Sequence, residues 1–511
     1  MKLFRAMATV GGLTGLSRIA GFVRDILTAS ILGAGPVADA FFVALKLPNF
    51  FRRVTAEGAF SVSFVPVYTE IDAQKGRAQA NDFASNMFML MLGALSAFCL
   101  LAICVMPVII YGVAPGFHDD PVRFDLATEL ARITFPYLLA MSLVALLGGV
   151  LNAQGRFAPF AFAPVLFNLS LISALLLADH FTSAGHALAW GVAGAGALQL
   201  GWLMIAAARS SFKWRLRMPH ITPETKKVLS LMGPGVIGAG VMHINLFADL
   251  IIASFLQTGA ISYLYYADRL NQLPLGIIGI AVGTALLPIL SKAISAKKDD
   301  EVKDLFNRAL EYCFALALPA AAALAMFAPL IISTLFERGA FDAQDSMASA
   351  QVLLCYVTGL PAYIAIKVFS TAHWAQQNTK TPVKIAVVAT IFNIALSLAL
   401  INVIGVAGIA LATGLSGWLQ VVMHCHVLKS QARFALDARF VRSLAGIVAA
   451  SGVMLAGAYG VNEVIFAGAG QITSLCAVVI SGGIIYALSL FAFGVINPSD
   501  IKQILKRKAQ A

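Results

Sequence analysis

Charge is scarce in this sequence. Asp, Glu, Lys and Arg make up only 12% of its 511 residues, whereas soluble domains average about 25%. Hydrophobic residues make up 59%, and they gather in runs of about 20 residues or more, the length that a helix needs to cross a bilayer. Such runs leave only short connectors. A soluble enzyme, a disulfide scaffold and a nucleic-acid-binding protein are therefore excluded.

Paired cysteines and nucleotide-binding motifs are also lacking. The six cysteines fall within apolar runs and form no CxxC pair, so we expect small core hydrophobes, with neither disulfides nor metal sites formed by cysteine. No Gly-Lys dipeptide occurs, which excludes a phosphate-binding P-loop. No pair of a nucleophile and a general base can be recognised in the sequence either. The sequence predicts a protein that is not an enzyme, has no catalytic residues or resident cofactor, and draws on an ion gradient or the membrane potential.

The apolar runs predict an all-α polytopic membrane protein with fourteen transmembrane helices. Each run is bounded by charged residues, Gly or Pro. The predicted spans are 4–32, 36–68, 81–113, 124–151, 158–179, 187–208, 228–256, 260–291, 309–335, 346–372, 382–403, 406–428, 441–461 and 470–495.

Lysine and arginine orient these spans. With both termini in the cytoplasm, 26 of the 36 Lys and Arg residues fall on cytoplasmic connectors and tails, and only Arg123 and Arg338 fall on the opposite side. The other eight lie at membrane depth. This is a strong positive-inside bias, and an odd number of spans would destroy it. The net charge of +11 is thus mainly a topology signal.

The two halves of the chain resemble each other at an offset of about 223 residues. Matching positions include Asp25 and Asp249, Pro107 and Pro329, Gln154 and Gln377, and Phe167-Asn168 and Phe392-Asn393. Six spans per half preserve orientation, which predicts two parallel six-helix repeats around a central cavity. We expect an N-terminal lobe at 1–217, a C-terminal lobe at 218–430, and two additional helices with a basic cytoplasmic tail at 431–511.

Thirteen ionisable residues are expected at membrane depth. They are Arg18, Arg24, Lys46, Arg52, Arg53, Arg132, Arg269 and Lys367, with Asp25, Asp39, Glu57, Asp249 and Asp268. Such groups are costly in a bilayer, so they normally face a bundle interior or a watery cavity. The alternative is that they form ion pairs or reach the interface from helix ends. That alternative is favoured for Arg132 and Lys367.

The first two spans hold most of this charge, five cations and three acids. Asp39, Lys46 and Arg53 recur every seven residues and form one stripe on the second span. A cluster of arginines suits a phosphate group, because the planar guanidinium binds two oxygens at once. The pattern therefore predicts a cationic cavity that fits a diphosphate and repels cationic drugs.

Three charged motifs carry a resemblance to a known family. The first runs through Ser17-Arg18, Gly21-Phe22-Val23-Arg24-Asp25, Ala38-Asp39-Ala40-Phe41, Arg52-Arg53 and Glu57-Gly58-Ala59-Phe60. The others are Tyr265-Tyr266-Ala267-Asp268-Arg269-Leu270 and Thr379-Lys380-Thr381-Pro382-Val383-Lys384. The chain resembles the MurJ (MviN) family of bacterial lipid II flippases, within the multidrug/oligosaccharidyl-lipid/polysaccharide exporter superfamily.

The resemblance implies a multi-pass protein of the bacterial inner membrane. It would move lipid II, an undecaprenyl-diphosphate-linked peptidoglycan precursor, by alternating access for cell-wall synthesis. The family's substrate-binding positions fall on Arg18, Arg24, Arg52 and Arg269. Gating or supporting roles are expected for Asp39, Asp25, Arg53 and Glu57. The expected partners are lipid II, membrane lipids and the cell-wall synthesis machinery.

Coupling to Na⁺ or H⁺ is open. Some members resemble sodium-binding transporters, and the matching positions here are Asp249, Asn393 and Thr413. Ser397 replaces the carboxylate expected beside them, which weakens a sodium site and favours the membrane potential as the driving force. Asp249 could instead be a proton site or an acid paired with a neighbouring arginine.

Three other functions compete with the flippase. An ion-coupled multidrug or other lipid-linked oligosaccharide exporter of the same superfamily is the first, but a drug exporter would have an acidic or apolar cavity. A membrane glycosyltransferase would need a catalytic acid in a large extracytoplasmic loop, and the longest one here, about residues 114–123, is short. A scaffold for division proteins would not need buried charge.

Overall fold

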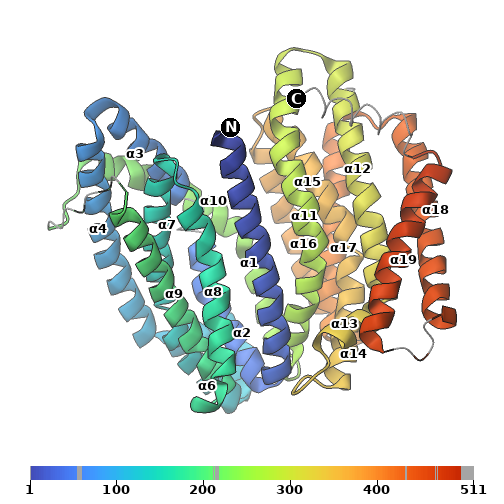
Figure 1. Cartoon of the computed structure of the whole chain (residues 1–511), viewed down its shortest axis with the longest axis horizontal. Coiled ribbons are helices and arrows are strands. Elements are labelled where there is room, and N and C mark those ends of the chain that lie inside the picture. The colour runs from blue at the N-terminus through green and yellow to red at the C-terminus, as the bar shows by residue number, and fades with distance from the viewer. Residues whose placement is uncertain are drawn as a thin grey trace. The chain divides into compact units, whose positions relative to one another are not determined.

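The apolar runs fold into long helices, as a computed structural model shows (Figure 1). The structure describes residues 2–53, 60–210, 218–431, 434–465 and 470–495, together with residues 212, 214 and 468. Within these ranges every regular element is a helix, and Arg338 and Phe341 form an isolated bridge in a turn. The predicted all-α fold is confirmed.

The helices follow one another with short connections. The first are α1 (Lys2–Leu32), α2 (Pro36–Phe51), α3 (Ser61–Lys75), α4 (Arg77–Cys104), α5 (Met106–Val113), η2 (Pro115–Asp119), α6 (Pro121–Thr134), α7 (Tyr137–Ala153), α8 (Ala158–Leu176), η3 (Ala178–His180), α9 (Ala184–Ala208), α10 (Pro223–Ser254) and α11 (Ala260–Ser295). The rest are α12 (Asp299–Met326), α13 (Ala328–Phe336), α14 (Ala343–Val357), α15 (Leu360–Ala375), α16 (Lys380–Ile404), α17 (Val406–Leu428), α18 (Ala438–Gly460), η5 (Val461–Ile465) and α19 (Gln471–Ala492).

Each predicted span coincides with one of these helices or with two consecutive ones. Among the described residues, ten helical segments are long and apolar enough to cross a membrane. The chain is therefore a multi-pass membrane protein, while the count of fourteen spans stays a prediction. Part of the second predicted span, residues 54–59 with Glu57, lies outside the described residues.

Prolines break two spans at matching places. Helix α4 ends at Val105 (φ −95°, ψ 16°), and α5 starts with Pro107 in its first turn. Helix α12 ends at Phe327 (φ −103°, ψ 17°), and α13 starts with Pro329 in its first turn. Proline lacks an N–H and clashes with the preceding turn, so the earlier helix has to stop. The same backbone break thus recurs 222 residues later.

Two left-handed loop residues recur at nearly the same offset. Gly76 (φ 85°) and Lys297 (φ 55°) each stand between two consecutive helices, and so do Gly155 (φ 75°) and Gln377 (φ 59°). A side chain disfavours positive φ, so positive φ at Lys297 and Gln377 is unusual, and it recurs at the positions that match Gly76 and Gly155.

Contacts between helices divide the chain into two compact units. Unit 1 comprises Met1–Ser262 with Arg338–Asp342, and unit 2 comprises Tyr263–Glu337 with Ala343–Ala511. The boundaries of the predicted lobes come from the sequence repeat, whereas the two units are defined by contacts. The lobe boundaries therefore stay a prediction.

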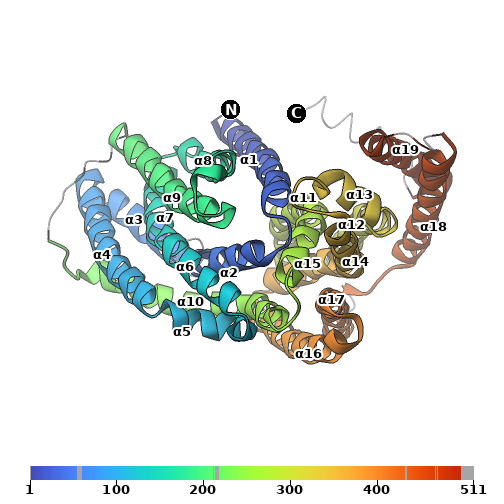
Figure 2. The same cartoon turned by 90° about the horizontal axis from the view of Figure 1, so that it is seen from below.

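Small residues let the helices of unit 1 approach closely. Helix α8 lies between α1 and α9 and packs against both (Figure 2). A Cβ at Gly191 of α9 would lie only 2.7 Å from the Ala174 Cβ of α8. Close backbone approach is typical of helix pairs in membranes, where packing rather than the hydrophobic effect drives association.

In unit 2 the last two helices are attached to α12. Helix α18 packs against both α12 and α19. Phe306 of α12, Val368 of α15 and Ile447 of α18 belong to one buried apolar cluster. The helices that lie outside the predicted repeat are therefore part of the same core.

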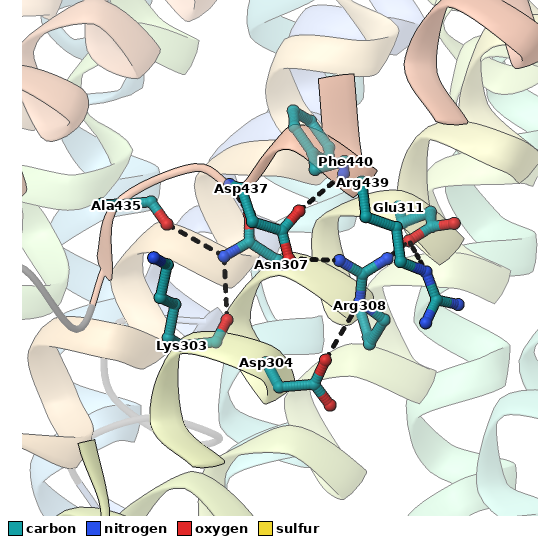
Figure 3. A network of polar contacts seen from close by, with 9 residues as sticks. All are labelled: Lys303, Asp304, Asn307, Arg308, Glu311, Ala435, Asp437, Arg439 and Phe440. Atoms are coloured by element: carbon teal, nitrogen blue, oxygen red, sulfur yellow. Dashed lines mark hydrogen bonds and ion pairs between the residues drawn. The ribbon is translucent and has the colours of Figure 1, made fainter. Parts of the chain in front are cut away.

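A buried polar network strengthens this attachment (Figure 3). Arg308 on α12 pairs with Asp437, with 2.6 Å between Nη2 and Oδ2, and also with Glu311. The Asp437 N–H donates to Asn307 Oδ1 at 3.0 Å. Asp437 also caps α18, because its Oδ1 accepts from the Phe440 N–H at 2.6 Å. A buried charge left alone would be costly, so the network holds the start of α18 against α12.

Asp437 gives the fold a pH dependence. Burial raises the pKa of Asp437, but hydrogen bonds from the Phe440 N–H and the Arg308 guanidinium outweigh it and hold that pKa below its ordinary value of 3.8. The carboxylate therefore stabilises the folded state above pH 3.8, and this contribution is lost as the pH falls through the lowered pKa.

We expect Asp437→Asn to lower the free energy of unfolding at pH 7 by about 1–2 kcal/mol, because the amide can still cap α18 but no longer supplies the charge that pairs with Arg308. Thermal unfolding of the detergent-solubilised protein measures it, and the difference from wild type should shrink below pH 3.8. Asp304→Asn is the control, because Asp304 is exposed and lies 3.4 Å from the same arginine. Equal losses in both variants, or a loss independent of pH, would contradict the role of Asp437.

Candidate functional site

Arg24 on α1 is buried in unit 1 and fully oriented by its neighbours. Its Nη2 lies 2.7 Å from Asp25 Oδ1, and its Nη1 donates to Asn168 Oδ1 at 2.9 Å. Arg24, Asp25 and Asn168 are 6%, 4% and 5% exposed. The guanidinium also lies over the Phe167 ring, 5.6 Å from its centroid. The predicted site residues Arg24 and Asp25 thus form one buried pair.

Asn168 links this pair to the backbone of two helices. Its Nδ2 donates to Ser17 O at 2.9 Å and to Pro164 O at 3.1 Å, so its Oδ1 is turned toward Arg24. The sequence marked Phe167-Asn168 only as part of the repeat, and its role as a partner of Arg24 was missed. One clue to this role was available from the sequence: a buried arginine requires a hydrogen-bond acceptor, and a neighbouring helix can supply it.

A pocket of about 400 Å³ adjoins this cluster within unit 1. Arg52 at the end of α2 lines it, and its Nε donates to Asn49 Oδ1 at 3.3 Å. Asn168 lines the same pocket. The other lining residues are Val10, Thr14, Asn49, Tyr137, Met141, Asn152, Phe157, Phe160, Ala161, Ala163, Pro164, Phe167 and Gln199. The structure therefore places Arg52 and Asn168, the hydrogen-bond partner of Arg24, at the same pocket.

The other predicted cations have different surroundings. The side chain of Arg18 is exposed on α1, and that of Arg53 is exposed just after α2. Arg269 belongs to unit 2 and is half-buried. Its Nη2 donates to Tyr265 Oη at 2.7 Å, and its guanidinium lies 4.7 Å from the centroid of the same ring. Such stacking orients the guanidinium.

Asp39 is fully buried and caps a helix. Its carboxylate accepts from the Gly259 N–H at 2.7 Å, the Ser262 N–H at 2.9 Å and the Ser262 hydroxyl at 2.6 Å. Gly259 and Ser262 lie at the start of α11, where N–H groups have no partner within the helix and carry partial positive charge. Asp39 thus joins α2 to the start of α11.

Arg123 adds a cation beside this cap. Its Nη1 lies 3.9 Å from Asp39 Oδ2, its Nε donates to Asp120 Oδ2 at 2.7 Å, and its guanidinium stacks on Phe117. Burial raises the pKa of Asp120, but the bonds from the Arg123 backbone and side chain outweigh it and lower that pKa. The charge pattern of the sequence predicts only the side of the membrane on which Arg123 lies, and it does not reveal this contact with Asp39.

A short turn is held tightly against the loop between α1 and α2. The Ala340 N–H donates to Ser30 O at 2.7 Å. Gly33 has φ 63°, and a Cβ there would lie 2.3 Å from Ala340 O. The positive φ of Gly33 and the close approach of Ala340 O both require glycine at this position. The Asp39 cap and the Arg123 cluster lie beside each other, and this turn packs against the end of α1.

The predicted sodium ligands are divided between the two units. Asp249 on α10 is half-buried in unit 1. In unit 2, Ser397 Oγ donates to the buried Asn393 Oδ1 at 3.3 Å, and Thr413 Oγ1 donates to Ile409 O at 2.9 Å. Within the described part of the chain, no three His, Cys, Asp or Glu residues group as metal ligands. The sodium site stays a prediction.

The chain is similar to known proteins over nearly its whole length. The family described as "Lipid II flippase MurJ" matches residues 28–481. "Probable lipid II flippase MurJ" of Rhizobium tropici is 37% identical over 524 residues, covering 100% of this chain and 98% of that protein. "Lipid II flippase MurJ" of Burkholderia cenocepacia is 36% identical, covering 89% of each.

Solved structures extend the likeness to the fold. One described as "Lipid II flippase MurJ, inward closed conformation" is 26% identical, with a TM-score of 0.80, and covers 95% of this chain and 98% of that one. An inward-facing multidrug resistance MATE transporter of the MOP superfamily, at 13% identity and a TM-score of 0.69, shares the fold alone. Since the family match, the relatives and the fold agree over nearly the whole length, the chain belongs to the MurJ family of lipid II flippases.

Proposed function

We propose that this protein translocates lipid II across the bacterial inner membrane by alternating access. The observation that carries the proposal is the buried Arg24, held by Asp25 and Asn168 beside the pocket that Arg52 lines. A diphosphate is the part of the substrate that two guanidiniums recognise best. The relatives' names supply the lipid that carries it.

Asp25 has a physical role in this proposal. Transport requires that the substrate be released after it has bound, as in channels, where binding must be weak enough to permit exit. Asp25 offsets one positive charge and orients the guanidinium in advance. Arg18 and Arg269 would add charge during transport, and Arg53 and Glu57 would support the site.

The proposed architecture is two parallel six-span lobes followed by two further spans, fourteen in all, with both termini in the cytoplasm. The recurring helix breaks at Val105 and Phe327 support this repeat. So do the left-handed residues that recur between helices. Two like halves around a cavity can rock to expose it to each side in turn.

In this account Asp39 acts at the gate. It joins α2 to the start of α11, at the end of unit 1 that we place outside the cytoplasm. Opening that end requires the carboxylate to give up three hydrogen bonds, so the cap stabilises the closed state. Asp39 is thus a gating residue and does not contact the substrate.

The membrane potential is the proposed driving force. A sodium site built from Asp249, Asn393 and Thr413 would have Ser397 where a carboxylate is expected, so Na⁺ or H⁺ coupling has weaker support. Cell-wall synthesis enzymes remain expected partners. An exporter of drugs or of other lipid-linked oligosaccharides is the alternative, and the cationic pocket argues against cationic drugs.

Arg24→Ala should reduce lipid II translocation by at least tenfold, because the diphosphate loses a buried guanidinium. Arg24→Lys should be impaired as well, since an ammonium group cannot form the planar fork. The measurement is the leaflet distribution of the precursor in cells depleted of their own flippase. Arg132→Ala is the control, because Arg132 is exposed and donates only to a backbone oxygen, Ile103 O, at 3.2 Å. Normal translocation by Arg24→Ala would refute the cationic mechanism.

Asp39→Asn should favour the open state, because an amide accepts fewer of the three hydrogen bonds and removes the charge from the start of α11. A cysteine placed at Gly35 should react several-fold faster with a membrane-impermeant thiol reagent in this variant. Asp119→Asn is matched to it, since Asp119 is exposed on the neighbouring η2. Unchanged labelling in Asp39→Asn, with normal transport, would remove Asp39 from the gate.

Cysteine labelling in intact cells tests the orientation. In a chain whose six native cysteines are replaced, a cysteine at Gly35 should react from outside, whereas one at Ser211 should be protected until the membrane is permeabilised. Ser211 lies outside the described residues, so this prediction rests on charge alone. External labelling at Ser211 would overturn the topology.

A further inference from the structure

Two amide side chains in the unit 1 pocket retain unused hydrogen-bonding capacity. Gln199 of α9 is 1% exposed, and its Nε2 donates to Ala163 O at 2.7 Å. Its Oε1 is buried and has no hydrogen-bond partner among the described residues. Asn152 of α7 also lines the pocket, and in the described part of the chain its side chain makes no hydrogen bond.

The other two amides of the pocket are already committed. Asn49 donates to Leu45 O at 2.9 Å and accepts from Arg52. Asn168 is used by Arg24 and by two backbone oxygens. The unused capacity is therefore one buried acceptor at Gln199 and a carboxamide at Asn152.

An unsatisfied buried oxygen is unfavourable, so a ligand that supplies a hydrogen-bond donor to it binds more tightly. A diphosphate diester and an acyl chain supply none. A secondary amide supplies an N–H for Gln199 and a C=O for the Asn152 amide, and the rings of Phe157, Phe160 and Phe167 give its methyl or methylene an apolar wall. Apolar walls with a few polar groups are typical of small-molecule sites.

We propose that this pocket binds a secondary amide of the substrate headgroup, next to the anion held by Arg52. The inference rests on the proposed function and extends it, since it makes the pocket a reader of the headgroup and not only of the diphosphate. The amide can come from an acetamido sugar or from a peptide, because both present the same N–H and C=O.

Binding of soluble fragments to the purified full-length protein tests this. Isothermal titration would compare N-acetylglucosamine 1-phosphate with glucose 1-phosphate, which lacks the acetamido group, and N-acetyl-alanyl-alanine with acetate, which has no N–H. We expect wild type to prefer at least one amide-bearing fragment by about tenfold over its partner. Preference in the first pair assigns the sugar, and preference in the second assigns the peptide. No preference in either pair would overturn the proposal.

Two variants distinguish a role of this pocket in binding from a role in folding. Asn152→Ala and Gln199→Leu should each reduce the preference to less than about threefold and leave glucose 1-phosphate binding unchanged. Asn152→Ala removes no side-chain hydrogen bond among the residues that the structure describes, so it tests the pocket even where Gln199→Leu weakens the contact with Ala163. Trp202→Phe is the control, because Trp202 lies on α9 outside the pocket and donates to Pro159 O at 3.0 Å.

Failure of the inference and failure of the proposed function give different results. If Asn152→Ala keeps the full preference, the amide site is wrong, and loss of translocation in Arg24→Ala would still support the flippase. If Arg24→Ala translocates normally, the flippase mechanism fails whatever the fragments show.

Discussion

The cost of placing charge inside an apolar helical protein governs this structure. Only 12% of the residues are charged, and those that are buried have found specific partners. Arg24 is held by Asp25 and Asn168, and Asp39 by the N–H groups that begin α11. Each partnership joins different helices or fixes a side chain at a pocket. The charge that transport requires therefore also determines how the helices are connected.

The same constraint separates supporting charge from charge that serves binding. The network around Arg308 pairs its guanidinium with three carboxylates, Asp304, Glu311 and Asp437, and holds α18 against α12. Arg24 is held by the Asp25 carboxylate and the Asn168 amide, and the neighbouring pocket contains Arg52 and two amides with unused capacity. A site that is incompletely satisfied by the protein alone can be completed by a ligand.

Much of the fold was predictable from the sequence, because hydrophobic run length and proline act locally. Every predicted span coincides with one or two helices, and the breaks lie just before Pro107 and Pro329. The hydrogen-bond partners of the buried charged residues were not predictable. Asn168 lies 144 residues from Arg24, and nothing in its own segment marks it as an acceptor for that guanidinium. Asp39 was chosen for its charge at membrane depth, whereas its capping of α11 depends on two loops meeting in space.

We propose that the buried Arg24 and the half-buried Arg52 of unit 1 hold a diphosphate. A structure of the protein with lipid II bound tests this most directly. The account predicts diphosphate oxygens within hydrogen-bonding distance of the Arg24 and Arg52 guanidiniums. A bound lipid II whose diphosphate touches neither arginine would contradict it.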